Sequence, residues 1–265
     1  MGNIMMRTKD VSKRVIWCDT EGGVRGVAMW DVTFIDEGPG DIVRALRMFD
    51  VSAAHKPGRA KLRKVVPPSV YHSAIKMSKV CLAEHVQAKD GNWTSATYRL
   101  VGSSMKDTVA GYLAKRAGCV LCAWNMKGHD RHVLRRLVGT AVLDRMVLWD
   151  ALPWFRSAYT LPKNTLASDK PGTPRHVFGV QSHGQAHTSM ADAAHLRDVV
   201  TRAAYCLKAG DDTRVSTVAW IGVSRDELFL AAQEEITQQV SEQAWIPVPM
   251  CSWTGTIPES IKDDT

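Results

Sequence analysis

Short apolar runs that alternate with helix-forming segments constrain the fold of this chain more than any other feature. After Ser104, an N-cap residue with an acid three residues on, apolar residues recur at helical spacing as far as Gly118. The run CVLCAW then indicates a buried strand, DRHVLRRLV a helix that begins at Asp130, and RMVLW another strand. Strands that alternate with helices favour an α/β sheet with helices on both faces.

Weaker patterns complete the predicted order of elements. The segment around residues 41–100 is the least regular part of the chain. The remaining expectations are a strand at 15–18, a turn at Gly22-Gly23, a strand within 26–37, a short helix at 41–49 (DIVRALRMF), a strand at 97–101, a loop over 160–186, a helix from about Ser189 to Leu207, a last helix after the capping box Ser224–Glu227 with Phe229, Ala232, Ile236 and Val240 as its buried stripe, and an extended tail over 246–265.

Two carboxylates lie at the end of the first predicted strand, directly after its apolar run. Asp19 and Glu21 follow Val15–Cys18, and the two-residue period of a strand places both side chains on one face. Two carboxylates so close repel each other unless a proton or a cation lies between them. An ordinary exposed strand end is the alternative interpretation of this D-x-E pattern.

The excess positive charge lies in one segment. Residues 51–80 contain seven basic and no acidic residues, and the remaining 27 basic residues balance the 27 acidic ones. A neutral body with one basic, Pro- and Gly-containing segment suggests a polyanion partner, either nucleic acid or a membrane surface. A solvated loop without a partner is the alternative. The seven residues are Lys56, Arg59, Lys61, Arg63, Lys64, Lys76 and Lys79.

The sequence gives no reason to expect a membrane-spanning, secreted or disulfide-rich protein. No apolar run is long enough to cross a bilayer, and the first residues lack the apolar stretch of a signal peptide. The six cysteines are too sparse for a disulfide framework and are expected to be reduced. We therefore expect an intracellular protein of cytoplasm or nucleus, neither secreted nor membrane-bound.

Two further motifs make the D-x-E pattern specific. Asn125 and Asp130 form N-x4-D before a helix, and His187 and Asp192 form H-x4-D at the entry of a later helix. This order resembles the DEDDh exonucleases, the DnaQ-like 3′→5′ branch of the ribonuclease H-like fold, over about residues 13–207. The resemblance implies an α/β fold with a mixed five-stranded sheet and helices on both faces. The implied domain covers residues 1–207, with a basic insertion at about 51–80 and a C-terminal helical extension and tail over 208–265.

The same resemblance implies hydrolysis of DNA or RNA from the 3′ end to nucleoside 5′-monophosphates. Two divalent cations, Mg²⁺ or Mn²⁺, would activate water and stabilise the phosphate, and such hard ions take oxygen ligands. His187 would be the general base, because imidazole titrates near neutrality, with His183 or His195 as substitutes. The implied metal ligands are Asp19, Glu21, Asp130 and Asp192, and the implied nucleic-acid contacts are Thr20, Gly22, Asn125, Lys56, Arg59, Lys61, Arg63 and Lys64.

Some residues depart from the family pattern or have simpler interpretations. Gly22-Gly23-Val24 replaces the usual Thr- or Ser-Gly pair and apolar residue, which leaves the grip on the 3′ end open. Asp130 and Asp192 could each merely cap a helix. Trp124 replaces the commoner histidine before Asn125 and is interpreted as a core residue, and Asp150 as a structural one.

Three alternatives remain open. Cys119, Cys122, His129 and His132 are zinc-ligand types, but only six residues separate the second from the third, so a zinc site is disfavoured. A catalytically silent nucleic-acid binder is the second alternative. A proofreading or processing subunit that docks on a polymerase through residues 208–265 is the third. The sequence leaves DNA versus RNA undecided.

Overall fold

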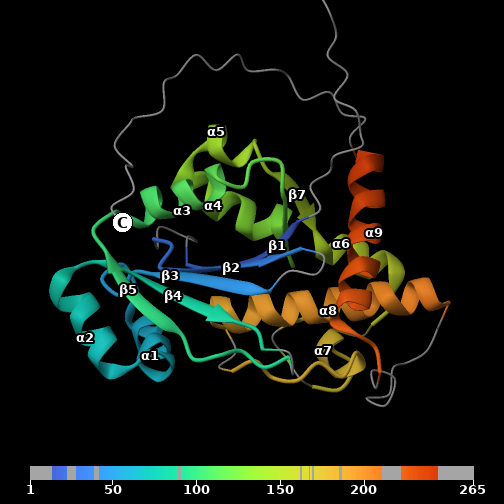
Figure 1. Cartoon of the computed structure of the whole chain (residues 1–265), viewed down its shortest axis with the longest axis horizontal. Helices are drawn as coiled ribbons and strands as arrows, with labels where there is room; N and C mark the ends of the chain where they lie inside the picture. The colour runs from blue at the N-terminus through green and yellow to red at the C-terminus, as the bar shows by residue number, and fades with distance from the viewer. Residues whose placement is uncertain are drawn as a thin grey trace, which may run out of the picture.

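A mixed β-sheet with helices on both faces forms the centre of the protein, as the alternating pattern predicts (Figure 1). The computed structural model describes residues 14–22, 28–38, 42–88, 91–161, 163–166, 168, 170–184, 187–210 and 222–243. Its strands are β1 (Val15–Glu21), β2 (Asp31–Glu37), β3 (Arg44–Phe49), β4 (Val80–Val86), β5 (Thr97–Val101), β6 (Val120–Ala123) and β7 (Val147–Asp150). Its helices are α1 (Lys56–Val65), α2 (Pro68–Met77), α3 (Met105–Ala114), the π-helical turn η2 (Met126–Asp130), α4 (Arg131–Val138), α5 (Thr140–Leu143), α6 (Ala151–Ala158), α7 (Pro174–Val177), α8 (Ser189–Ala209) and α9 (Arg225–Gln243).

The sheet has seven strands, two more than the five expected from the resemblance. Their order is β5-β4-β3-β2-β1-β6-β7. The pairs β1–β2, β2–β3, β3–β4 and β4–β5 are antiparallel, whereas β6 is parallel to both β1 and β7. The strands that were not expected are β3 and β4, which come from the least regular part of the sequence, whereas β5 is the strand predicted at 97–101. Strand β1 lies inside the sheet, between β2 and β6.

The helix expected at residues 41–49 is wrong, because this segment contains strand β3. Its backbone pairs with β2 on one side and β4 on the other, so that Arg47 lies opposite both Thr33 and Ala83. The local sequence permits either structure, since leucine, methionine and arginine are good helix formers. Hydrogen bonds to two distant strands therefore override the local preference.

The basic segment is helical, so the solvated-loop alternative is wrong in its conformation. Residues 51–80 contain α1 and α2 between β3 and β4. Leu62 and Tyr71 on these helices are buried against Phe49 and Cys81 of the sheet. Proline stands in the first turn of both helices, where its missing N–H costs no hydrogen bond.

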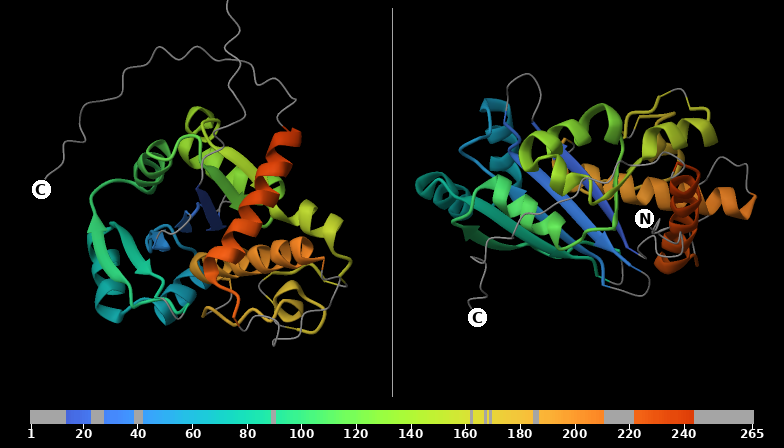
Figure 2. Two further views of the ribbon diagram at one scale, coloured as in Figure 1. Left: turned by 45° about the vertical axis from the view of Figure 1, so that its right-hand side comes forward. Right: turned by 90° about the horizontal axis from the view of Figure 1, so that it is seen from above.

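The two faces of β1 contact different helices. Trp17 packs in one core with Leu196 and Val200 of α8, whereas Ile16 and Cys18 pack in a second core with residues of α3 and α4. Figures 1 and 2 show α8 on one face of the sheet and α3, α4 and α5 on the other. Side chains at odd positions of β1 therefore face α8.

Helix boundaries follow the predicted caps. Ser104 accepts a hydrogen bond from the Asp107 N–H at 3.1 Å and starts α3. At the start of α9 the Ser224 N–H donates to Glu227 Oε2, and the Glu227 N–H donates back to Ser224 Oγ. This reciprocal pair is the predicted capping box.

The C-terminal helices α8 and α9 pack against each other and the sheet (Figure 1). Phe229, Ala232 and Ile236 of α9 are buried in the same core as Trp17, and Val240 packs against that core. The apolar stripe of α9 is therefore already covered. Within the described residues no helix has both the length and the apolar character that crossing a bilayer requires. The tail expected over 246–265 lies outside the described residues.

Candidate metal centre

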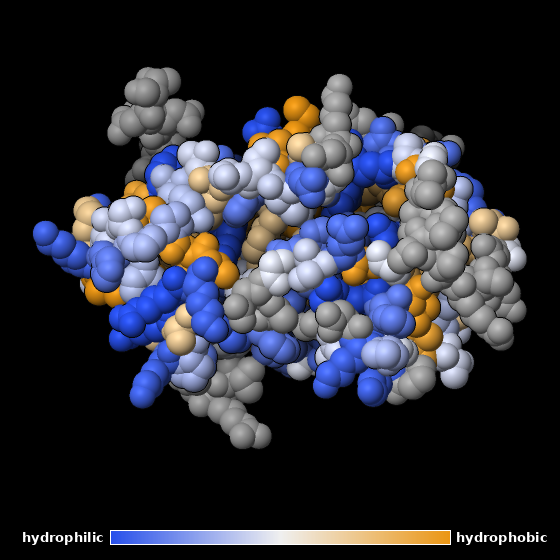
Figure 3. Space-filling view, turned by 90° about the horizontal axis from the view of Figure 1, so that it is seen from below, coloured by the Kyte–Doolittle hydropathy of each residue, from blue (hydrophilic) through white to orange (hydrophobic). Residues whose placement is uncertain are grey.

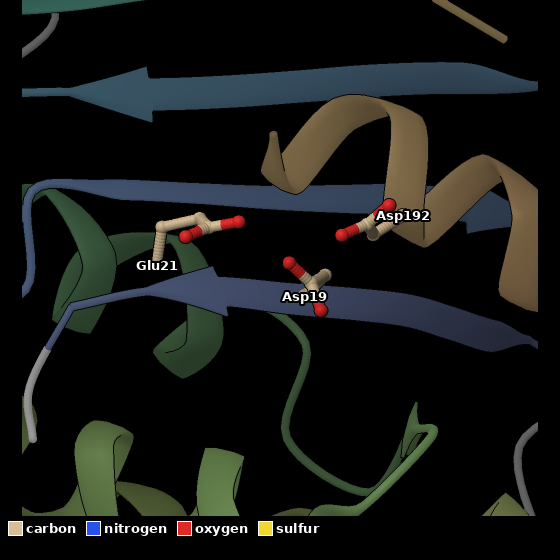
Figure 4. A group of neighbouring side chains, drawn as sticks. All are labelled: Asp19, Glu21 and Asp192. Carbon is tan, nitrogen blue, oxygen red and sulfur yellow. The ribbon is translucent and has the colours of Figure 1, made fainter. Parts of the chain in front are cut away.

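Strand β1 places Asp19 and Glu21 on the face that α8 covers (Figure 4). Four buried apolar residues, Val15–Cys18, fix the strand between β2 and β6, so the two acids emerge where its apolar part ends. On β2 they lie opposite Thr33 and Asp31, respectively.

Contacts between β2 and α8 position the first turn of that helix. Ser189 Oγ lies 2.8 Å from Thr33 Oγ1, and the Ser189 N–H donates to Asp31 Oδ2 at 3.4 Å. Asp192 is three residues further on, so its side chain lies on the same face of the helix as Ser189. The neighbours of Asp19 and Glu21 on β2 thus bring Asp192 to the same place.

Three of the four predicted ligands are brought together. Oxygens of Asp19, Glu21 and Asp192 all lie within 4.8 Å of one another, well inside the roughly 10 Å limit that a two-metal pair allows. Figure 4 shows the three carboxylates pointing toward one another from β1 and α8. Asp192 is buried, and its Oδ1 has no hydrogen-bond partner among the described residues. The cluster is a set of hard oxygen donors of the type that Mg²⁺ and Mn²⁺ bind.

The electrostatics of this cluster favour a bound cation or proton. Burial raises the pKa of Asp19 well above its ordinary value, and the neighbouring Asp130, Asp192 and Glu21 raise it further. Burial also raises the pKa of Glu21, to about 7, although Lys61 opposes this shift. A divalent ion would lower both values by favouring the ionised form.

Asp130, the fourth predicted ligand, lies just outside this group. It precedes α4, and its Oδ1 accepts a hydrogen bond from Thr20 Oγ1 at 2.8 Å. Burial raises the pKa of Asp130 to about 6, while the Thr20 hydrogen bond and His129 oppose the shift. Its side chain does not accept a hydrogen bond from the α4 N-terminus, so helix capping does not account for it.

The three histidines near α8 have different surroundings. His187 is exposed, has a left-handed backbone (φ 59°), and its ring forms no hydrogen bond or ion pair within the described ranges. His183 Nε2 contacts Asp198 Oδ2 at 2.7 Å. His195 is fully buried, its Nε2 accepts the His183 N–H at 3.0 Å, and its Nδ1 lies 3.7 Å from Asp192 Oδ1. Neutral His195 therefore carries its proton on Nδ1, facing Asp192.

Two residues expected to contact nucleic acid have structural roles. Thr20 is buried and its hydroxyl holds Asp130. Gly22 has φ 93°, and a Cβ there would lie 2.5 Å from the Ala28 carbonyl oxygen, so only glycine fits. Asn125, in contrast, is exposed at the start of η2.

The predicted basic contacts all lie on α1. Lys56, Arg59, Arg63 and Lys64 are exposed. Figure 3 shows strongly hydrophilic side chains on the left of the lower face, the side on which α1 and α2 lie in Figure 1. Lys61 is less exposed, and its Nζ lies 3.6 Å from Glu21 Oε2. The basic segment therefore reaches the carboxylates directly.

The zinc alternative does not assemble. Cys119 and Cys122 are both buried but belong to cores on opposite faces of the sheet. Among the described residues, the only group of histidine, cysteine or acidic side chains placed to hold a metal ion is Asp19, Glu21 and Asp192. The two cysteines are three residues apart, an odd number, so an extended chain directs their side chains to opposite faces.

Asp150 and Trp124 have the structural roles expected of them. Asp150 accepts hydrogen bonds from the Lys127 and Leu152 N–H groups and caps α6. Trp124 packs against Phe155, and its Nε1–H donates to the Asn164 carbonyl oxygen. Neither side chain belongs to the metal cluster.

The expectations from sequence named no partner for the buried acids of β2 or for Asp192. Arg47 pairs with Asp31, Arg197 pairs with Glu37, and His195 faces Asp192. Only the Asp192–His195 pair has a local signal, a spacing of three residues on a helix. Comparison of the chain with protein-family models, curated proteins and solved structures gave no match.

Proposed function

We propose that this protein is a metal-dependent 3′→5′ exonuclease of the DEDDh type that releases nucleoside 5′-monophosphates from DNA or RNA. The observation that carries the proposal is the meeting of Asp19, Glu21 and Asp192, from motifs far apart in the sequence, with oxygens within 4.8 Å. Strands β3-β2-β1-β6-β7 would be the five-stranded ribonuclease H-like sheet, with β4 and β5 added at its edge.

The residues present fit two divalent cations. Every donor is a carboxylate oxygen, and Asp192 Oδ1 is buried without a hydrogen-bond partner among the described residues. Asp19, Glu21 and Asp192 would hold the ions together with Asp130, whose carboxylate Thr20 orients. Such ions supply charge stabilisation for the phosphate and activation of water.

His187 is proposed as the residue that removes the proton from the attacking water. Its ring is exposed and uncommitted within the described ranges, so it can accept a proton and release it to solvent. His183 and His195 are weaker candidates, because each already uses a ring nitrogen in a contact with Asp198 or with the backbone. The imidazole would act without holding a metal ion.

Nucleic acid is the proposed partner, bound by its phosphates. The exposed cations of α1 lie on the helix that also sends Lys61 to the carboxylates, which supports a path for the strand along α1. A binder without activity would have no use for a cluster of repelling acids beside such a helix.

The test is digestion of 5′-labelled DNA and RNA oligonucleotides with Mg²⁺ or Mn²⁺, with each end blocked in turn. We expect stepwise shortening from a free 3′ end, release of 5′-monophosphates, and no reaction when the 3′ end is blocked. Asp19→Asn is the matched control, since it removes a charge and preserves side-chain size. Shortening from the 5′ end, or equal activity of the variant, would contradict the proposal.

A further inference from the structure

Lys61 differs from the other cations of α1 in what it contacts. Its Nζ lies 3.6 Å from Glu21 Oε2, whereas Arg59 donates to the Ala54 and Ser52 carbonyl oxygens and Arg63 lies over the ring of Tyr71. No arginine in the described ranges forms an ion pair with Asp19, Glu21 or Asp192. Within the described ranges, the cation that pairs with this cluster from α1 is therefore a lysine, not an arginine.

The approach of Lys61 depends on how α1 packs. Gly58 is buried against Trp30, and a Cβ at this position would lie 2.8 Å from Trp30 Cε2. The Trp30 N–H donates to the Glu21 carbonyl oxygen at 3.1 Å, so Trp30 links the end of β1 to α1. Lys61 follows Gly58 by three residues and shares its face of the helix. A close helix contact thus directs Lys61 to Glu21.

The pair is suited to exchange because lysine is a flexible cation. A surface ion pair contributes little stability, and 29% of the Lys61 side chain is exposed. A divalent ion bound to Glu21 would take up the negative charge that attracts Lys61 and would repel its ammonium group. The four-carbon stem then allows Nζ to move to another anion nearby.

We propose that Lys61 is a phosphate-binding residue of this site, which pairs with Glu21 without metal and with a backbone phosphate of nucleic acid once Glu21 binds a cation. This inference rests on the proposed function. Lys61 and the metal ion compete for Glu21 when no nucleic acid is present, and they act together when it is bound. The basic helix is therefore coupled to metal loading.

The test compares Lys61→Met with Lys76→Met, which removes an equal charge from an exposed position on α2. In the first measurement, Mn²⁺ is titrated into each protein without nucleic acid, followed by electron paramagnetic resonance. We expect Lys61→Met to bind Mn²⁺ roughly tenfold more tightly than wild type, because a competing cation is gone, and Lys76→Met to change affinity less than about twofold. Equal affinities for the two variants would overturn the Glu21 pairing.

The second measurement is binding of a fluorescent oligonucleotide whose 3′-terminal phosphorothioate linkages resist hydrolysis. With Mn²⁺, Lys61→Met should weaken binding about tenfold more than Lys76→Met does, the usual contribution of a charge-assisted hydrogen bond. Without Mn²⁺ the two variants should differ little, and Lys61→Arg should recover most of the affinity. Tighter Mn²⁺ binding with no metal-dependent loss of oligonucleotide binding would overturn the phosphate role.

Neither measurement needs turnover. If the wild-type protein fails to hydrolyse DNA and RNA, the proposed function fails, while the metal-dependent difference between Lys61→Met and Lys76→Met still supports or overturns the role of Lys61.

Discussion

Two groups of carboxylates lie where α8 covers β1 and β2, and they are neutralised differently. Asp31 accepts two hydrogen bonds from Arg47, and Glu37 accepts two from Arg197 and one from Trp17 Nε1–H. Asp19, Glu21 and Asp192 have no arginine partner in the described part of the chain. Lys61 Nζ lies 3.6 Å from Glu21, and His195 Nδ1 lies 3.7 Å from Asp192.

This difference distinguishes carboxylates with a structural role, which are paired with arginine, from carboxylates that are available to bind a ligand. A bidentate arginine completes a buried carboxylate, which then has no need of a ligand. Glu21 lies directly opposite Asp31 in the β1–β2 register, so strand neighbours belong to different groups. The arginine-paired group also positions the other, because Asp31 accepts a hydrogen bond from the first turn of α8.

The largest expected effect is loss of hydrolysis when one unpaired acid is neutralised. Asp19→Asn should abolish activity by removing a metal ligand, while its metal-free stability should stay equal or rise because a crowded charge is gone. Exonuclease assays and urea unfolding in EDTA measure the two effects. Retained turnover would break the comparison, since Asp19 would then be as structural as Asp31.

His187→Ala should lower the turnover rate by roughly 10²–10⁴, the usual share of a positioned general base. Mn²⁺ affinity should not change, because the imidazole holds no metal ion. The pH profile of the rate should differ between wild type and variant, because the variant lacks the proposed proton acceptor. Full activity with the same pH profile would exclude His187 and direct the search to His195.

Arg197→Met should destabilise the protein by about 3–5 kcal/mol, because it leaves Glu37 buried and unpaired. Urea unfolding measures the loss, and the double variant with Glu37→Gln should recover part of it. The comparison thus predicts that Arg197→Met lowers the free energy of unfolding, whereas Asp19→Asn leaves that of the metal-free protein equal or raises it. A loss as small as that of an exposed arginine would show that Glu37 does not need its partner.

The metal-free protein should lose stability as pH rises through the carboxylate titration. The pKa of Glu21 rises from its ordinary 4.5 to about 7 on folding, so the folded state binds more protons than the unfolded state in that interval. The free energy of unfolding should therefore fall between pH 4.5 and 7, by about 2–3 kcal/mol more in wild type than in Glu21→Gln. Urea titrations in EDTA test this difference, and Mg²⁺ should remove it. A wild-type curve parallel to that of the variant would contradict the pKa shift.

The smallest effect concerns the exposed lysines of α1. Lys56→Gln with Lys64→Gln should reduce the slope of log K against log salt for single strands by about 0.7 for each lost phosphate contact. The matched control is Lys106→Gln on α3 with Lys115→Gln at its C-cap, since both lysines are exposed. Equal slopes in the two double variants would show that α1 faces solvent or another partner.

Much of the sheet and the identity of the acids follow from the sequence. Alternation alone places Asp19 and Glu21 on one face, and the Ser104 and Ser224 caps predict the starts of α3 and α9. Strand β3 was not predictable in this way, because DIVRALRMF permits a helix and only pairing with β2 and β4 makes it a strand.

The sequence by itself determined which side chains are present at the strand ends and helix starts, since local periodicity and capping act over a few residues. Only the tertiary structure decided which carboxylates are paired. Asp31 and Arg47 lie on the neighbouring strands β2 and β3, and most of the chain separates Glu37 from Arg197. Lys61 reaches Glu21 only because Gly58 lets α1 pack closely on Trp30. Charge neutralisation is a short-range interaction between distant residues, so it depends on packing that no local pattern encodes.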